Sequence, residues 1–206
     1  MLDLPITFQE AMSHQGPTLA ELFEVVIAFL RGRRDVVVFG AYAVNAYVES
    51  PRMTADIDLM STNTDRLLPE LCTLLHERFR IAARVRSVAN GRGFRVYQLR
   101  KGEKNRHLVD VRSVDSLPSS RDIDGVSVVQ PEELVILKLR SLVARRNTDK
   151  GLSDRLDLHR LLFAYPEFRD PRGPVYVLLD GATSDVLAMW HEILAEDIEP
   201  DDDDAY

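Results

Sequence analysis

The chain contains a single cysteine, Cys72, among its 206 residues, so it cannot form an internal disulfide bond. It also lacks any uninterrupted run of about 18 apolar residues, and we therefore expect no membrane-spanning helix. The N-terminal segment MLDLPITFQE has neither the basic flank nor the apolar core of a secretory signal. These absences favour a reducing compartment, and we expect the protein to be cytoplasmic.

An excess of basic residues is also missing, since the formal net charge is −7, which at first argues against a nucleic-acid partner. Residues 192–206 explain this value, because they contain eight acidic and no basic residues. The remaining 191 residues carry 26 basic and 25 acidic side chains, and residues 77–112 alone carry eleven basic and three acidic ones. This distribution permits a phosphate-bearing partner at residues 77–112, although solvated strand faces would have the same composition.

Hydrophobic periodicity predicts helices and strands in alternation over the first part of the chain. Helices are expected at residues 18–30, 41–48 and 65–79, and strands at 35–39, 55–60, 81–88, 94–100, 107–114 and 126–129. Three further helices are expected at residues 131–146, 153–163 and 184–195. We therefore predict an α/β lobe over residues 1–130, a helical lobe over residues 131–198 and a disordered acidic tail over residues 199–206.

Two aspartates, Asp56 and Asp58, lie two residues apart in a predicted strand, so their side chains leave the same face. Asp110 is a lone acid between apolar residues of another predicted strand. If the two strands are neighbours, three carboxylates converge, and hard oxygen ligands of this kind suit Mg²⁺ or Mn²⁺. Such a site can hold two ions about 4 Å apart for phosphoryl transfer.

Other interpretations of these acids are open. An Asp-x-Asp pair also occurs in loops, calcium sites and glycosyltransferases. In a purely structural interpretation, Asp56 is a helix or turn cap and Asp110 is one arm of a salt bridge. The Asp-x-Asp pair here follows a predicted strand, Gly40 and a predicted helix, and backbone N–H groups at the start of a helix bind phosphate oxygens. This combination favours phosphate chemistry.

These residues resemble the nucleotidyltransferases of the DNA polymerase β superfamily, whose signature is Gly-Gly or Gly-Ser, a spacer and Asp-x-Asp. The block is most similar to AbiEii-type bacterial nucleotidyltransferases, which are often the toxin of a toxin–antitoxin pair. The matching positions are Gly40, Ala43, Val44, Arg52, Thr54, Asp56, Ile57, Asp58 and Leu59, followed by Lys138, Arg145, Arg146, Asp154 and Asp157. The resemblance covers roughly residues 35–163 and implies an α+β fold, with a small mixed sheet, flanking helices and a C-terminal helical lobe.

The resemblance also implies a role for each acid of the signature. Asp56 and Asp58 would hold the metal ions that bind the nucleotide phosphates, and Asp110 would complete the second site and orient or deprotonate the attacking hydroxyl. Two departures concern the phosphate loop. Ala41 stands where the family has a second Gly or a Ser, and the spacer to Asp56 is about one residue longer than usual.

Nucleotide-binding roles follow from the same resemblance. Gly40 and Ala41 would let the backbone approach the β- and γ-phosphates, and Lys138 would neutralise the triphosphate. Arg52 and Thr54 would contact phosphate or brace the strand, and the sequence does not decide between these roles.

Four other polar residues receive plainer assignments. For Asp154 and Asp157, capping a helix or pairing with Arg146 or Lys150 accounts for the sequence as well as catalysis does. His107 and His159 have no partner at ligand spacing, which favours surface or packing roles for both.

The implied function is metal-dependent transfer of a nucleoside monophosphate from an NTP to an acceptor hydroxyl, with an RNA 3′ end, notably of tRNA, as the favoured acceptor. The basic segment 77–112 is the feature that favours RNA, and an antitoxin protein is an expected partner. The alternatives are a protein or small-molecule acceptor, a catalytically weak or inactive binding protein of the same fold, indicated by Ala41, and a glycosyltransferase.

Overall fold

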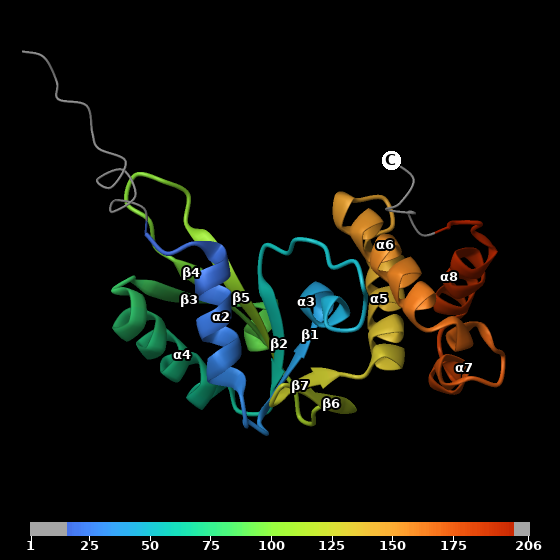
Figure 1. Cartoon of the computed structure of the whole chain (residues 1–206), viewed down its shortest axis with the longest axis horizontal. Coiled ribbons are helices and arrows are strands. Elements are labelled where there is room, and N and C mark those ends of the chain that lie inside the picture. Colours follow the sequence, from blue (N-terminus) through green and yellow to red (C-terminus); the bar gives the residue numbers. More distant parts are fainter. Residues whose placement is uncertain (1–15, 200–206) are drawn as a thin grey trace, which may run out of the picture.

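A seven-stranded mixed sheet forms the body of the chain in the computed structural model, which describes residues 16–199 (Figure 1). The strand order is β3-β4-β5-β2-β1-β7-β6, so the centre of the sheet brings together strands that are distant in the sequence. β2 pairs antiparallel with β1 and parallel with β5, and β1 pairs parallel with β7. The two outer hairpins, β3-β4 and β6-β7, are antiparallel.

Five elements make up the first part of this body. They are α2 (Leu19–Leu30), β1 (Val36–Phe39), α3 (Gly40–Asn45), β2 (Ile57–Ser61) and α4 (Thr64–Phe79). Thr18 and Glu21 close a capping box that starts α2, since each side chain accepts a hydrogen bond from the other residue's backbone N–H. α2 and α4 then pack on one face of the sheet through their buried leucines and valines.

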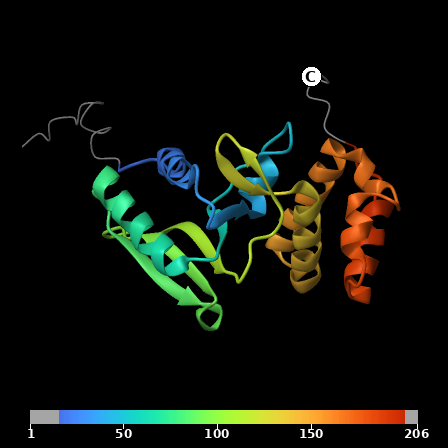
Figure 2. The same ribbon diagram turned by 90° about the horizontal axis from the view of Figure 1, so that it is seen from below.

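The second part is a meander followed by helices. Its elements are β3 (Ala83–Val88), the 3₁₀ turn η1 (Ala89–Gly91), β4 (Gly93–Gln98), β5 (Arg106–Ser113), β6 (Ser120–Ile123), β7 (Val126–Val129), α5 (Pro131–Arg145), α6 (Asp149–Ala164), η2 (Pro166–Arg169), α7 (Pro174–Leu179) and α8 (Ser184–Ala195). The helices from α5 onward gather at one end of the sheet, as both views show (Figures 1 and 2). Between residues 16 and 199, no helix combines the length and apolar character that a membrane span requires.

Strand alternation separates the core from an open face of the sheet. Val109 and Val111 are fully buried on the side covered by α2 and α4, whereas Asp110 and Arg112 alternate with them on the other side. The predicted α+β class, with a small mixed sheet and C-terminal helices, is confirmed.

Other parts of the sequence prediction need correction or stay open. β6 and α7 were not predicted, and α6 begins at Asp149 rather than near residue 153. The division into lobes at residue 130 stays a prediction, since α5 packs on α3 as well as on α6. The predicted disordered tail lies outside the described residues except for Glu199.

Candidate active site

The three aspartates of the signature come together through the pairing of β2 with β5. Asp58 lies directly opposite Asp110 in this parallel pair, and Asp56 immediately precedes β2. Carboxylate oxygens of Asp56 and Asp110 and a ring nitrogen of His107 all lie within 4.8 Å of one another. The sequence made this convergence conditional on β2 and β5 being neighbours, which they are.

His107 belongs to this cluster, so the expectation that it has no partner at ligand spacing is wrong. Its Nδ1 lies 2.9 Å from Asp56 Oδ2, and its ring packs against that of Tyr97. A β-bulge explains the placement, because Val96 pairs with Val109 but the next residue, Tyr97, pairs with His107. The extra residue in β5 shifts the alternation, so His107 and Asp110 face the same site although they are three residues apart.

Gly40 is required by the position of the Asp58 carboxylate. The backbone at Gly40 has φ of +70°, and a Cβ added there would overlap the Asp58 side chain. Only glycine therefore allows α3 to start against this carboxylate. Gly40 and Ala41 both line the cleft in front of Asp58, where a ligand would meet the chain's backbone.

The electrostatics of the aspartates point to a missing positive charge. Burial, together with the charges of Asp56 and Asp110, raises the pKa of Asp58 to about 7, although Lys138 and Arg112 oppose this shift. The hydrogen bond from His107 has the largest effect on Asp56 and lowers its pKa. Asp58 is thus an acid whose charge its surroundings do not compensate.

All eight predicted site residues line a single cleft of about 820 Å³ between the sheet and α5 and α6. They are Gly40, Ala41, Arg52, Thr54, Asp56, Asp58, Asp110 and Lys138. Five further basic residues line the same cleft: Arg92, Arg95, Arg112, Arg145 and Lys150. The structure therefore brings the predicted residues together, and their individual roles stay predictions.

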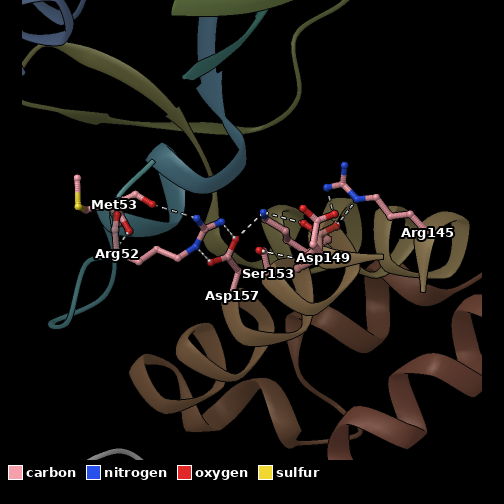
Figure 3. Close-up of polar contacts among 9 residues, drawn as sticks. Arg52, Met53, Arg145, Asp149, Ser153 and Asp157 are labelled. Carbon is pink, nitrogen blue, oxygen red and sulfur yellow. Dashed lines mark hydrogen bonds and ion pairs between the residues drawn. The ribbon is translucent and has the colours of Figure 1, made fainter. Parts of the chain in front are cut away.

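Lys138 is buried within the helices rather than exposed on their surface. Its Nζ lies 3.0 Å from Asp154 Oδ1 and 2.6 Å from Asp157 Oδ2. Asp154 also pairs with Arg145, and Asp157 pairs with Arg52 (Figure 3). The expected partners of the two aspartates, Arg146 and Lys150, are therefore wrong.

His159 is the second histidine for which a surface or packing role was expected. It is buried on α6, and its Nε2 lies 2.7 Å from a carboxylate oxygen of Glu196. Burial has the largest effect on its pKa and lowers it, together with the charges of Arg169 and Arg155. Glu196, counted from the sequence as part of the acidic C-terminal segment, thus belongs to an ion-paired cluster beside α8.

A divalent cation fits the donor set of the cleft. Asp56, Asp110 and His107 offer two oxygen ligands and one nitrogen ligand at the separations that one ion requires. The raised pKa of Asp58 is the second observation, because a cation beside this buried carboxylate would relieve the repulsion from its two neighbours. The residues present are therefore compatible with Mg²⁺ or Mn²⁺.

Comparison with known proteins identifies the fold class. No protein-family model and no curated protein matches the chain. Among solved structures, the Megavirus polyadenylate synthase matches 77% of this chain with 20% identity and a TM-score of 0.56. JHP933 from Helicobacter pylori matches 92% of this chain and 93% of its own length, with 14% identity and a TM-score of 0.51.

The chain spans about a third of the polyadenylate synthase, 34% of that chain. The fold is that of nucleotidyltransferase-like proteins.

Proposed function

We propose that the protein is a metal-dependent nucleotidyltransferase, which moves a nucleoside monophosphate from an NTP to an acceptor hydroxyl. The observation that carries this proposal is the convergence of three aspartates, Asp56, Asp58 and Asp110, in a cleft that Lys138 also lines. Asp56 and Asp110 also form a cluster with His107. An undercompensated cluster of acids suits two or more positive charges in a ligand. The nucleotidyltransferase-like fold supports the same conclusion.

The residues of the cleft divide the work of the reaction. The acceptor oxygen attacks the α-phosphorus, the bond from this phosphorus to the α,β-bridging oxygen breaks, and pyrophosphate leaves. Asp110 accepts the hydroxyl proton or orients the hydroxyl, and Asp56 and Asp58 would hold a divalent cation with it. When bound, Mg²⁺ or Mn²⁺ would neutralise charge on the phosphate oxygens. Lys138 contacts the triphosphate from the opposite wall.

An RNA 3′ end is the acceptor that we favour, and the open face of the sheet supports it. Register places Arg86, Arg95 and Asp110 side by side across β3, β4 and β5. In the neighbouring row, Arg84 lies beside Tyr97, and Tyr97 lies beside the cluster's His107. A basic face with an aromatic ring, continuous with the catalytic aspartates, suits a flexible phosphate backbone whose end reaches the cleft.

The AbiEii-type assignment, with tRNA as the RNA, a toxin role, an antitoxin partner and a cytoplasmic location, rests on the sequence resemblance. Induced expression in a bacterial host tests the toxin role. We expect growth arrest with the wild-type chain and normal growth with Asp56→Ala expressed at the same level. Arrest by both chains would mean that toxicity does not depend on nucleotide transfer.

The activity itself is tested with each α-labelled NTP, Mg²⁺ or Mn²⁺, and total RNA. We expect label from one preferred NTP to enter RNA with the wild-type chain and with Arg146→Gln, a charge control outside the cleft. Asp56→Ala should abolish the labelling. Unchanged labelling in that variant would overturn the assignment. Label in a protein or small molecule would replace RNA as the acceptor, and no NTP-dependent thermal shift would favour an inactive binding protein.

A further inference from the structure

A chain of ion pairs joins the segment before the catalytic strand to the helices across the cleft. Arg52 lies in the connection between α3 and β2, and it pairs with Asp157 of α6 (Figure 3). Asp157 also binds Lys138 of α5, which binds Asp154 of α6 in turn. Arg145, at the end of α5, completes the chain at Asp154 with an Nη2–Oδ2 distance of 2.6 Å.

Arg52 uses three of its five N–H groups in bonds to the protein, two of them to this chain of ion pairs. Its Nε and Nη2 donate to the two oxygens of Asp157 at 2.6 and 2.9 Å, a bidentate arrangement. Its Nη1 donates to the backbone carbonyl of Met53 at 3.2 Å. Each of the three guanidinium nitrogens therefore has a protein acceptor.

Lys138 is held by two carboxylates of α6. An ammonium group has three N–H donors, and Asp154 and Asp157 accept two of them. One donor is left on a side chain that lines the cleft. The two carboxylates, both at most 1% exposed, thus fix the ammonium from behind while its last donor is available to an anion.

The segment around Arg52 has few other anchors. From residue 49 to residue 56, a stretch that the structure describes throughout, no side chain is fully buried, and Met53 is 94% exposed. Asn45 holds the backbone of Arg52 with two hydrogen bonds, at 2.7 and 3.0 Å. The Asn45 contacts hold the segment to α3, and Asp157 is what holds it to the far side of the cleft.

We propose that Asp157 is a positioning residue, which through Arg52 fixes the segment leading to Asp56 and through Lys138 fixes the triphosphate contact. Arg52 is then a brace and not a phosphate ligand. This inference rests on the proposed function, since it describes how the two walls of the same cleft are held in register. A displacement of about 1 Å at a reacting group lowers rates by on the order of 10²-fold, so such a brace matters.

A double-substitution cycle on nucleotide affinity tests the inference. Binding of an NTP analogue with an α,β-methylene bridge is measured by calorimetry in Mn²⁺ for Arg52→Gln, Asp157→Asn and the double variant. We expect each single change to weaken binding by about 10- to 100-fold, and the double variant to match Asp157→Asn. Arg146→Gln, which breaks an ion pair with Glu192 outside the cleft, should bind as the wild type does.

Two results of this cycle would overturn the inference. Additive losses would mean that Arg52 acts independently of Asp157, as a direct phosphate ligand does. Rescue of affinity in Arg52→Lys would mean the same, because lysine keeps the charge but cannot make the bidentate pair.

Hydrogen exchange of the nucleotide-free chain separates this inference from the proposed function. We expect the amides of residues 49–56 to exchange about tenfold faster or more in Arg52→Gln and Asp157→Asn, and unchanged in Arg146→Gln. If the wild type binds no nucleotide, the proposed function fails, and the exchange rates alone decide whether Asp157 anchors the segment. Unchanged exchange in a wild type that binds nucleotide would refute the brace. Arg52→Gln keeps the test valid if Asp157→Asn does not fold.

Discussion

Two groups of aspartates face each other across the cleft, and their surroundings are opposite. In the strand group, Asp58 is surrounded by Asp56 and Asp110, and burial with these charges raises its pKa to about 7. In the helix group, burial alone would raise the pKa of Asp157, but hydrogen bonds and charges from Arg52 and Lys138 outweigh it and lower the pKa. Asp157, whose charge is already matched, holds the structure, whereas Asp58, whose charge is not matched, is the acid that a cation would stabilise.

The largest effect is expected on activity, from changes in the strand group. Asp58→Asn removes a metal-binding charge without changing side-chain size, and nucleotide transfer should fall by at least about 10³-fold. In EDTA the same variant should be no less stable than the wild type, because a repelled charge is lost. Transfer assays and urea unfolding measure the two effects. Activity close to that of the wild type would remove Asp58 from the site.

The next effect is expected on stability, from changes in the helix group. Asp157→Asn leaves Arg52 without its buried counter-charge and leaves Lys138 with Asp154 alone, and the free energy of unfolding should fall by about 3–5 kcal/mol. Urea unfolding followed by circular dichroism, with Asp58→Asn as the matched comparison, measures the difference. Equal stability of the two variants would contradict the division into a structural and a ligand-binding group.

Strand alternation was enough to predict that Asp56 and Asp58 share a site. Side chains two residues apart in a strand leave the same face, whatever the tertiary structure is. Asp110 was predicted only on the condition that its strand lies beside β2. That pairing depends on the order of the sheet, which puts β5 between β4 and β2. Local patterns do not encode this order.

His107 and the partners of Asp157 were missed for different physical reasons. The bulge in β5 shifts the face of His107, and no periodicity of two predicts such a shift. Arg52 and Asp157 are 105 residues apart, so their contact is a product of tertiary packing. β6 was missed because its residues are mostly exposed, and its sequence, Ser-Arg-Asp-Ile, has no hydrophobic alternation.

A third expected effect is a pair of opposite pH dependences in the metal-free chain. The native pKa of Asp157 is lowered, so its stabilisation is present above the unfolded value and is lost as the pH falls through the native pKa. The native pKa of Asp58 is raised from 3.8 to about 7, so its contribution is greatest at low pH. As the pH rises from about 4 to about 7, the contribution of Asp58 to the free energy of unfolding falls by at most about 4 kcal/mol.

Urea unfolding in EDTA at several pH values tests both pH dependences, because the stability of the wild type is compared with that of each variant. As the pH rises from 4 to 7, the wild type should lose stability relative to Asp58→Asn. As the pH falls below 4, it should lose stability relative to Asp157→Asn. Parallel pH profiles for the wild type and both variants would show that the two groups do not differ in charge matching.

The smallest effect concerns the one member of the strand group that is not an acid. An imidazole nitrogen suits transition metals better than Mg²⁺, whereas carboxylates suit Mg²⁺ well. If His107 is a ligand, His107→Ala should weaken Mn²⁺ binding by about tenfold and Mg²⁺ binding by less, as measured by electron paramagnetic resonance and competition. His191→Ala, a change of an exposed histidine on α8, is the control. If His107 only orients Asp56 through their 2.9 Å contact, the binding of Mn²⁺ and of Mg²⁺ should weaken equally. The carboxylates alone would then select the cation.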